Sequence, residues 1–467
     1  MFGATGRRLD TLFEHMSAIP GDVDPDRQPP MTVPLRHFLV ASAFLPLGVL
    51  VGVAAAADLR LGLLSLAHAH LLLVGWVCLT IAGAMTQFVP VWSGVDLHST
   101  RLAALQLPLL AGGLVGLAAS LLLPRLALLP VFGGALLLGF WLFVYNVGRT
   151  LAHARPFDTT ERHFALGLGF LVLAPLLGLL LAIDFTHPLF AGSPVTRPRV
   201  VAAHATLAVF GAVLTTVLGA LYQLATMFTQ TELHGVDEPL QRVEALGFPA
   251  GVLLLAGGRL VGSAPVARVG GALVALALLA FALVLARRLW QTHVDRTPML
   301  SRYAVVAAAT ALWAGLALPA WLAEPLGRAS LFGAPGTAHL LLLGVVGFVV
   351  LGTIYHVVPF VVWVHRYSDR LGYEPVPMID DLYDDRVAAA DFWSLLVGSA
   401  LLVAGDLFDL PSTLSLVGGV AVLLGSVLFV ANVASVVREH APGSLATVVF
   451  GGWVEIDSRD APTTEGD

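Results

Sequence analysis

The sequence predicts an all-α, polytopic membrane protein with twelve transmembrane helices in three pseudo-repeated four-helix arcs. Hydrophobic residues make up 57% of its 467 residues and charged residues only 12%, whereas a soluble protein has about 25% charged residues. Apolar stretches of about 20 residues, long enough to cross a bilayer as helices, recur along the chain. One helical segment also occurs in three similar copies. The composition excludes a nucleic-acid-binding protein and indicates that membrane lipid surrounds most of the chain.

Twelve apolar stretches form a membrane region at 36–437, between polar tails at 1–35 and 438–467. Because twelve is an even number of crossings, both tails lie on the same side of the membrane. That side receives 18 of the 25 basic residues, since the other side holds only seven: Arg60, Arg125, Arg197, Arg199, Arg259, Arg268 and Arg328. The positive-inside rule therefore predicts a multi-pass plasma-membrane protein with both termini cytoplasmic. The predicted spans are 36–57, 62–92, 101–123, 125–149, 162–184, 199–228, 242–263, 266–289, 301–323, 335–365, 388–409 and 413–437.

The cysteine content limits the chemistry of the chain. Cys78 is the only Cys and lies within an apolar stretch. The chain can therefore form no intrachain disulfide, no Cys-ligated cluster or zinc site, and no covalently attached c-type haem, which needs a CxxCH motif.

Spans two, six and ten align with one another without gaps. Residues 67–92 read AHAHLLLVGWVCLTIAGAMTQFVPVW, residues 203–228 read AHATLAVFGAVLTTVLGALYQLATMF, and residues 336–361 read GTAHLLLLGVVGFVVLGTIYHVVPFV. The repeat unit is therefore four helices long. Two-fold transporters pair related halves around one site, whereas three units predict a ring of three arcs with a pocket between each adjacent pair. The units cover about 36–149, 162–289 and 301–437.

Histidine recurs at two columns of this alignment. The second column holds His68, His204 and Thr337, and the fourth holds His70, Thr206 and His339. An ionisable side chain inside a span is costly and marks a functional site. Ten other His are predicted to lie in loops or at membrane edges: His15, His37, His98, His153, His163, His187, His234, His293, His365 and His440.

The spacing of His68 and His70 predicts two separate sites. Two residues on a helix point about 200° apart around its axis, so the two imidazoles cannot bind one metal ion. In a ring of three arcs, His68 faces His339 and His70 faces His204. The pocket between spans six and ten then receives only Thr206 and Thr337 and has no ligand.

A pocket with two His suits a haem b held on both faces, because this group needs no Cys and only two axial ligands. Zinc or copper would require three or four converging ligands, so no copper site is predicted. Two glycine columns are predicted to let the flat macrocycle approach the helix backbones. They are Gly75, Gly211 and Gly344, and then Gly83, Gly219 and Gly352.

Segment 67–94 resembles the tenth-helix motif of the haem–copper oxidase subunit I superfamily, which includes the cytochrome oxidases and nitric oxide reductases. The resemblance implies twelve helices in three arcs of four. It also implies a low-spin haem held by a second-helix His and the second His of the tenth helix, and these positions are His68 and His339 here. This pairing agrees with the one inferred from the repeat.

The sequence departs from that family at the reductase centre. Thr337 replaces the His that would hold the high-spin haem, span 242–263 has no His for a copper or iron ion, and Ala208 replaces the oxidase tyrosine. The Arg pair that contacts the haem propionates is missing from 407–412. Its candidate substitutes are Arg60, Arg125 and Arg328.

We therefore expect a respiratory-chain electron-transfer protein that carries two haem b groups, with a quinol or an electron-carrier protein as partner and room for an additional membrane subunit. Two alternatives remain at this stage. One is a divergent terminal oxidase or nitric oxide reductase, which would make the chain a respiratory oxidoreductase. The other is a metal-ion transporter or sensor. Three polar side chains lie near the inner ends of the repeated spans: Gln87, Gln223 and His356. Two roles are open for them, which are to line a quinone or water pocket or to pack the helix ends.

Overall fold

The computed structural model describes residues 29–451, and within this range every regular element is helical. Twelve helices are long and apolar enough to cross a membrane. The predicted all-α, twelve-span membrane fold is therefore confirmed. Predictions for residues 1–28 and 452–467, including His15 and most of the two tails, fall outside the described residues.

The spans follow one another with short connections. Nine of the spans contain one uninterrupted α-helix each: α2 (Thr32–Ala56), α5 (Thr100–Leu122), α6 (Leu129–Leu151), α7 (Thr159–Asp184), α10 (Asp237–Val261), α11 (Ala264–Trp290), α12 (Pro298–Ala323), α14 (Asp385–Phe408) and α15 (Ser412–His440). A short helix, α16 (Leu445–Phe450), follows the last span. The three repeated spans are composite: α3 (Leu64–His70), η2 (Leu71–Cys78) and α4 (Leu79–Ser93); α8 (Arg197–Thr206), η4 (Leu207–Leu214) and α9 (Thr215–Thr229); η6 (Leu340–Gly347) and α13 (Phe348–Arg366). Short 3-10 turns are η3 (Leu126–Leu128), η5 (Arg328–Ser330), η7 (Ser368–Arg370) and η8 (Ile379–Leu382).

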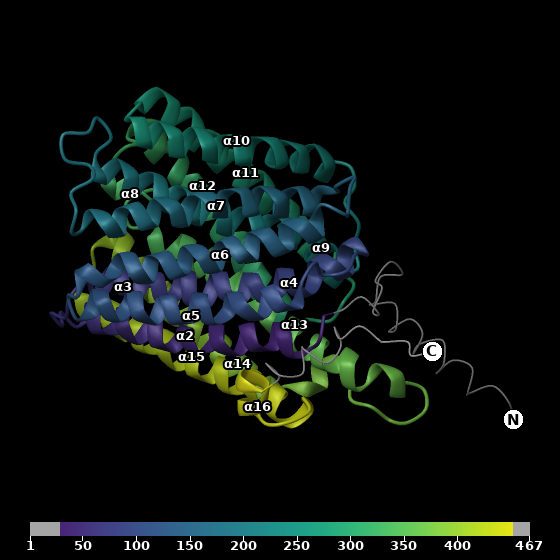
Figure 1. Cartoon of the computed structure of the whole chain (residues 1–467). Coiled ribbons are helices and arrows are strands. Elements are labelled where there is room, and N and C mark those ends of the chain that lie inside the picture. The colour runs from purple at the N-terminus through teal and green to yellow at the C-terminus, as the bar shows by residue number, and fades with distance from the viewer. Residues whose placement is uncertain (1–28, 452–467) are drawn as a thin grey trace, which may run out of the picture.

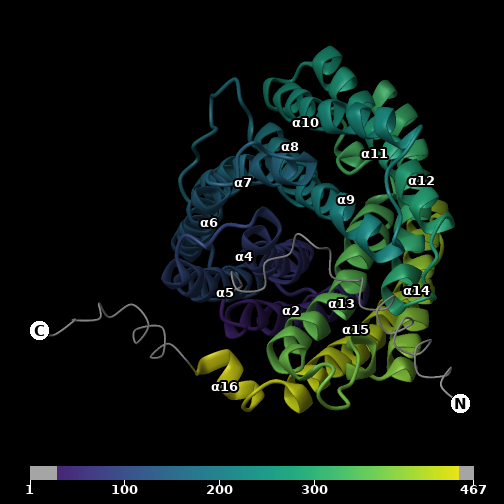
Figure 2. The same cartoon turned by 90° about the vertical axis from the view of Figure 1, so that its right-hand side faces the viewer.

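The helices run roughly side by side (Figure 1) and form a ring when viewed along them (Figure 2). In each repeat unit, the composite span packs against the first helix of that unit: η2 and α4 against α2, η4 and α9 against α7, and η6 and α13 against α12. Contacts of α6 with α7, of α11 with α12, and of α15 with α2 join the units. The contact of the last span with the first closes the ring.

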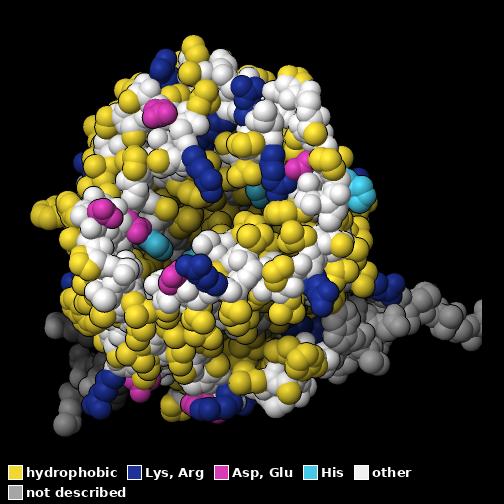
Figure 3. Space-filling model, turned by 90° about the vertical axis from the view of Figure 1, so that its left-hand side faces the viewer, with side chains coloured by type: hydrophobic (Ala, Val, Ile, Leu, Met, Phe, Trp, Pro, Cys, Tyr) yellow, Lys and Arg dark blue, Asp and Glu magenta, His cyan; other side chains and the backbone are white. Residues whose placement is uncertain are grey.

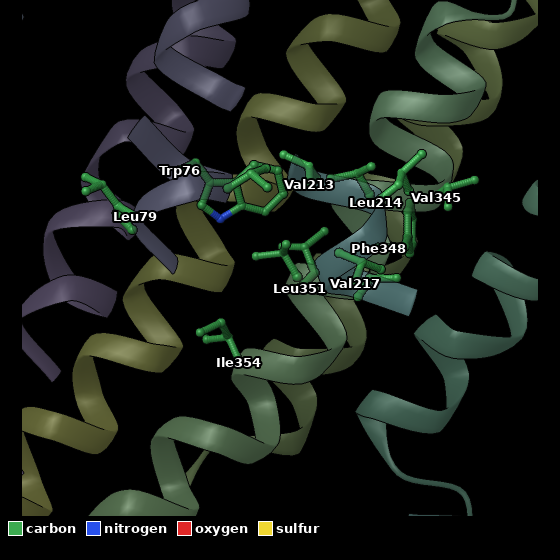
Figure 4. Close-up of a cluster of buried hydrophobic side chains, with 14 of the residues drawn as sticks. Trp76, Leu79, Val213, Leu214, Val217, Val345, Phe348, Leu351 and Ile354 are labelled. Atoms are coloured by element: carbon green, nitrogen blue, oxygen red, sulfur yellow. The ribbon is translucent and has the colours of Figure 1, made fainter. Parts of the chain in front are cut away.

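The three composite spans meet at a packed centre (Figure 4). Trp76 and Leu79 from the first unit, Val213, Leu214 and Val217 from the second, and Val345, Phe348, Leu351 and Ile354 from the third fill it, and all are at most 5% exposed. Their apolar contact ties the three arcs together.

A π-helical segment interrupts each composite span at the same place in the repeat. The segments Leu71–Cys78, Leu207–Leu214 and Leu340–Gly347 occupy identical columns of the sequence alignment. Each begins immediately after the column that contains His70, Thr206 and His339. Because π-helical turns are rare and occur mostly at functional sites, three of them in register support the repeat and direct attention to the histidine columns.

The two glycine columns pack against neighbouring helices. A Cβ at Gly75 or Gly211 would approach the ring of Phe44 or Phe170 to 2.7 or 2.8 Å, and one at Gly344 would lie 3.3 Å from Ala309 Cβ. These partners belong to the first helix of each unit, α2, α7 and α12. The glycines therefore allow close helix packing within a unit. The cofactor-lining role predicted for Gly75, Gly83, Gly211, Gly219, Gly344 and Gly352 does not match this placement.

The second glycine column makes room for three equivalent polar side chains. A Cβ at Gly83, Gly219 or Gly352 would lie 2.6, 2.5 or 3.2 Å from the Cβ of a polar residue near the start of α2, α7 or α12. These residues are His37, His163 and Arg302. His37 and His163 were predicted to lie in loops or at membrane edges. That prediction is wrong, because each is only 1% exposed and packs within the bundle.

Each of these residues bonds to the third helix of its own unit. His37 Nδ1 donates to Val33 O, and its Nε2 accepts from Gln106 Nε2 at 3.1 Å. His163 Nε2 lies 3.1 Å from Glu244 Oε1, and Arg302 donates to Asp391, which also accepts from Tyr355. We call these contacts the three polar ties. They hold the first and third helices of each arc together where polar groups could not bond to water.

The polar tie of the third unit predicts a specific pattern of stability. Asp391→Leu leaves the buried Arg302 guanidinium without its carboxylate, which is expected to cost about 3–5 kcal/mol. Replacing both partners, Arg302→Met with Asp391→Leu, removes the uncompensated charge and should recover most of the loss. Thermal unfolding of purified protein in a neutral detergent measures both.

The control is Arg60→Gln, which removes the guanidinium of a solvent-exposed pair with Asp58 and should change stability by less than about 1 kcal/mol. A double variant as unstable as Asp391→Leu alone would contradict the assignment of the loss to an unpaired buried charge.

Candidate histidine sites

All four histidines singled out by the repeat lie near one end of the bundle. His68 and His70 are in α3, His204 is in α8, and His339 directly precedes η6. We call this end, where α2 ends and α3 begins, the histidine end. Figure 3 shows it as a hollowed face with hydrophobic side chains at depth and with Arg, Asp or Glu, and His side chains around the hollow. The four imidazoles are partly exposed.

His68 and His204 sit in equivalent settings in the first two units. His68 Nδ1 donates to Gly48 O of α2 at 2.8 Å, and His204 Nδ1 donates to Ala174 O of α7 at 2.8 Å. A glycine lies one helical turn beyond each acceptor. A Cβ at Gly52 would lie 2.6 Å from the His68 ring, and one at Gly178 would lie 3.0 Å from the His204 ring. Each imidazole is thus held against the preceding helix at a site that only glycine permits.

His70 and His339, from the other column, are held differently. His70 Nδ1 donates to Leu66 O of its own helix at 2.8 Å. His339 Nδ1 donates to Asp406 Oδ2 of α14 at 2.5 Å. The His339 and Asp406 side chains are 38% and 31% exposed.

The four rings therefore share one hydrogen-bonding state. In each ring Nδ1 carries the proton and donates it, and no residue within 29–451 hydrogen-bonds to Nε2. A histidine that binds a metal typically donates its other N–H to a carboxylate or a backbone carbonyl, which fixes the tautomer and the ring orientation. All four residues are in the state that a metal-binding Nε2 requires.

His68 and His70, adjacent on one helix, use acceptors on different helices. Among the described residues, no group of three or more His, Cys, Asp or Glu is placed to hold a metal ion.

The third interface, between spans six and ten, is filled by side chains. Thr206 accepts a hydrogen bond from Arg259 Nη1 at 2.7 Å, and the guanidinium also donates to Pro325 O, Ser330 O and Leu331 O. Arg259 is only 2% exposed. Arg259 lies in α10, the seventh span. The haem–copper oxidase superfamily, which segment 67–94 resembles, has metal-binding His in its seventh helix.

Aromatic rings complete this filling. Phe210, Trp313 and Trp321 contact one another with ring centroids 5.4–5.7 Å apart. Trp313 Nε1 donates to Phe332 O at 2.8 Å, and Trp321 Nε1 donates to Ser330 O at 2.7 Å. Thr337 bonds to Ala334 O beside them. The interface that has no His pair is thus occupied by an Arg and three aromatic rings.

The candidate propionate-binding arginines lie in unrelated places. Arg60 is 89% exposed and faces Asp58 at 3.9 Å. Arg125 is exposed, just before η3. Arg328 lines a cleft beside the third interface. The structure does not bring these three together around the His pairs.

A cavity of about 70 Å³ lies between the repeated spans, nearer the opposite end of the bundle. Its lining is apolar apart from Thr80, Thr216 and Thr353. Gln87, Gln223 and His356 are not among its lining residues. His356 instead packs against the rings of Phe228 and Phe360, which agrees with the helix-packing alternative for this residue.

Sequence reasoning missed Asp406, Arg259 and the polar ties. One signal could have revealed the ties: the triplets Arg36-His37-Phe38 and Arg162-His163-Phe164 repeat at the starts of α2 and α7. For Asp406 and Arg259, no spacing in the sequence identifies the partner. Comparison with known proteins adds nothing here, because no family model and no curated protein matches the sequence.

Proposed function

We propose that this chain binds two b-type haems and carries electrons within the membrane. His68 and His339 would hold one haem, and His70 and His204 the other. The observation that supports this most directly is the shared state of the four imidazoles. Each donates from Nδ1 and leaves Nε2 unbonded by any described residue.

The residues at the histidine end fit such a group. Haem has an apolar ring and charged propionates, and the hollow of Figure 3 has hydrophobic side chains at depth and charged side chains around it. When bound, a haem with two axial His supplies one-electron exchange without an open coordination position. The carbonyls of Gly48 and Ala174 and the clearance at Gly52 and Gly178 fix the two inner imidazoles.

Two observations weigh against the alternatives. A terminal oxidase or nitric oxide reductase would need an open iron and a second metal beside span seven, where Arg259 and the aromatic rings now lie. A transporter would need a path along the ring axis, where the nine side chains labelled in Figure 4 pack.

The relation to the haem–copper oxidase superfamily is part of this proposal and rests on the motif at 67–94. A quinol or an electron-carrier protein remains the proposed partner. Cytoplasmic termini in a plasma membrane remain the proposed orientation, and it rests on the distribution of Arg.

The first prediction concerns the absorption spectrum of the purified full-length protein. Reduction should give sharp b-type bands that carbon monoxide does not shift, because two His saturate each iron. A pyridine haemochrome assay should give two haems per chain. A carbon monoxide shift would favour the oxidase alternative, and a preparation without haem would contradict the proposal.

The second prediction separates the two sites. His70→Ala and His204→Ala should each lose the same haem and retain the other, whereas His68→Ala and His339→Ala should lose the one that the first two variants retain. Redox titration with spectral deconvolution distinguishes the two populations. His98→Ala, outside the composite spans, is the control and should keep both. Loss of both haems, or of neither, from His70→Ala would count against two separate pockets.

The third prediction concerns the midpoint potential of one haem. The Asp406 carboxylate accepts from His339 Nδ1, and its negative charge stabilises the ferric over the ferrous state. Asp406→Asn should raise the potential of the His68–His339 haem by roughly 40 mV, the equivalent of about 1 kcal/mol for one electron. The potential of the other haem should not move, and Asp409→Asn is the matched control. Equal shifts in both haems would contradict a direct effect through His339.

A further inference from the structure

A cleft of about 470 Å³ opens at the histidine end, beside the third interface. It lies between the start of α8, the end of α10 and the 326–331 segment. Four arginines line it: Arg197, Arg199, Arg259 and Arg328. No acidic residue is among its lining residues.

Arg259 forms the buried side of the cleft. Its guanidinium donates to three backbone carbonyls and one hydroxyl, and no described carboxylate pairs with it. Carbonyl dipoles satisfy the N–H groups but leave the net charge, and a buried charge without a counter-ion is costly. The cleft is where a counter-ion could approach it.

Of the other three arginines, one has an acidic partner and two have none among the described residues. Arg197 is neutralised by Asp184, 2.6 Å away. Arg199 donates to Pro194 O and Val261 O and lies over Gly262, where a Cβ would be 2.5 Å from its guanidinium. Arg328 is exposed at the opening. Arg199, Arg259 and Arg328 thus leave three positive charges around the cleft without an acidic partner among the described residues.

We infer that this cleft binds a phosphate-bearing anion. Arg is the side chain best suited to phosphate, because its planar fork donates two hydrogen bonds to two oxygens. The site is distinct from the His pairs, since none of the four histidines is among the residues that line the cleft.

The cleft is level with the ends of α8 and α10, where headgroups of a surrounding bilayer would lie. An anionic phospholipid headgroup and free phosphate share the same chemistry, and basic pockets between transmembrane helices bind lipid headgroups. The inference does not depend on haem binding.

The test compares two double variants with the same change of charge. Arg199→Gln with Arg328→Gln alters the cleft, whereas Arg125→Gln with Arg268→Gln removes two exposed arginines of the same end that lie outside it. Full-length protein is delipidated in neutral detergent. Its thermal stabilisation is then measured on titration with phosphatidylglycerol, phosphatidylcholine or inorganic phosphate.

The cleft variant should need at least about ten times more phosphatidylglycerol than wild type for the same stabilisation, because it has lost two charge-assisted contacts. The Arg125/Arg268 variant should respond like wild type. Stabilisation by phosphatidylglycerol alone identifies a lipid headgroup as ligand, and stabilisation by inorganic phosphate as well identifies the phosphate group. Equal losses in the two double variants, or equal effects of phosphatidylcholine and phosphatidylglycerol on wild type, would overturn the inference.

Discussion

The structure depends on one constraint: a polar group inside a membrane must find its partner within the protein. This constraint explains why the buried polar side chains occur as bonded sets. The three polar ties join the first and third helices of each arc. The Nδ1 atoms of the four histidines bond to the protein. Arg259 bonds to three carbonyls and a hydroxyl. The four Nε2 atoms have no hydrogen-bond partner and Arg259 has no carboxylate partner among the described residues, and an external ligand can contribute there.

The three-fold repeat supplies one geometry and lets its three interfaces diverge. The π-helical segments and the glycine columns are retained in all three units, so the helices cross in the same way. The polar ties keep their positions while their chemistry changes from His–Gln to His–Glu to Arg–Asp. The helix packing is therefore common to the three units, whereas the polar side chains that tie the first and third helices differ from unit to unit.

The sequence was sufficient to predict what depends on regular patterns. Hydropathy gave the twelve spans, and a gap-free alignment gave the columns of His68 and His70 and their expected partners. It misplaced His37 and His163, because residues near the ends of apolar stretches look like loop residues when only hydropathy is considered. It assigned the glycines to a cofactor, because nothing in their spacing indicates which helix they face. Asp406 lies 67 residues from His339, and only the folded arrangement reveals that contact.

The third interface shows what an arc boundary requires when it lacks a histidine pair. An empty apolar space between two arcs would forfeit packing on every wall. Where Thr206 and Thr337 replace histidine, Phe210, Trp313, Trp321 and Arg259 occupy that space. Where the histidines remain, their rings are partly exposed around a hollow. If the hollow is the proposed haem site, the ligand performs there the packing that the aromatic rings perform at the third interface, and binding and folding are coupled.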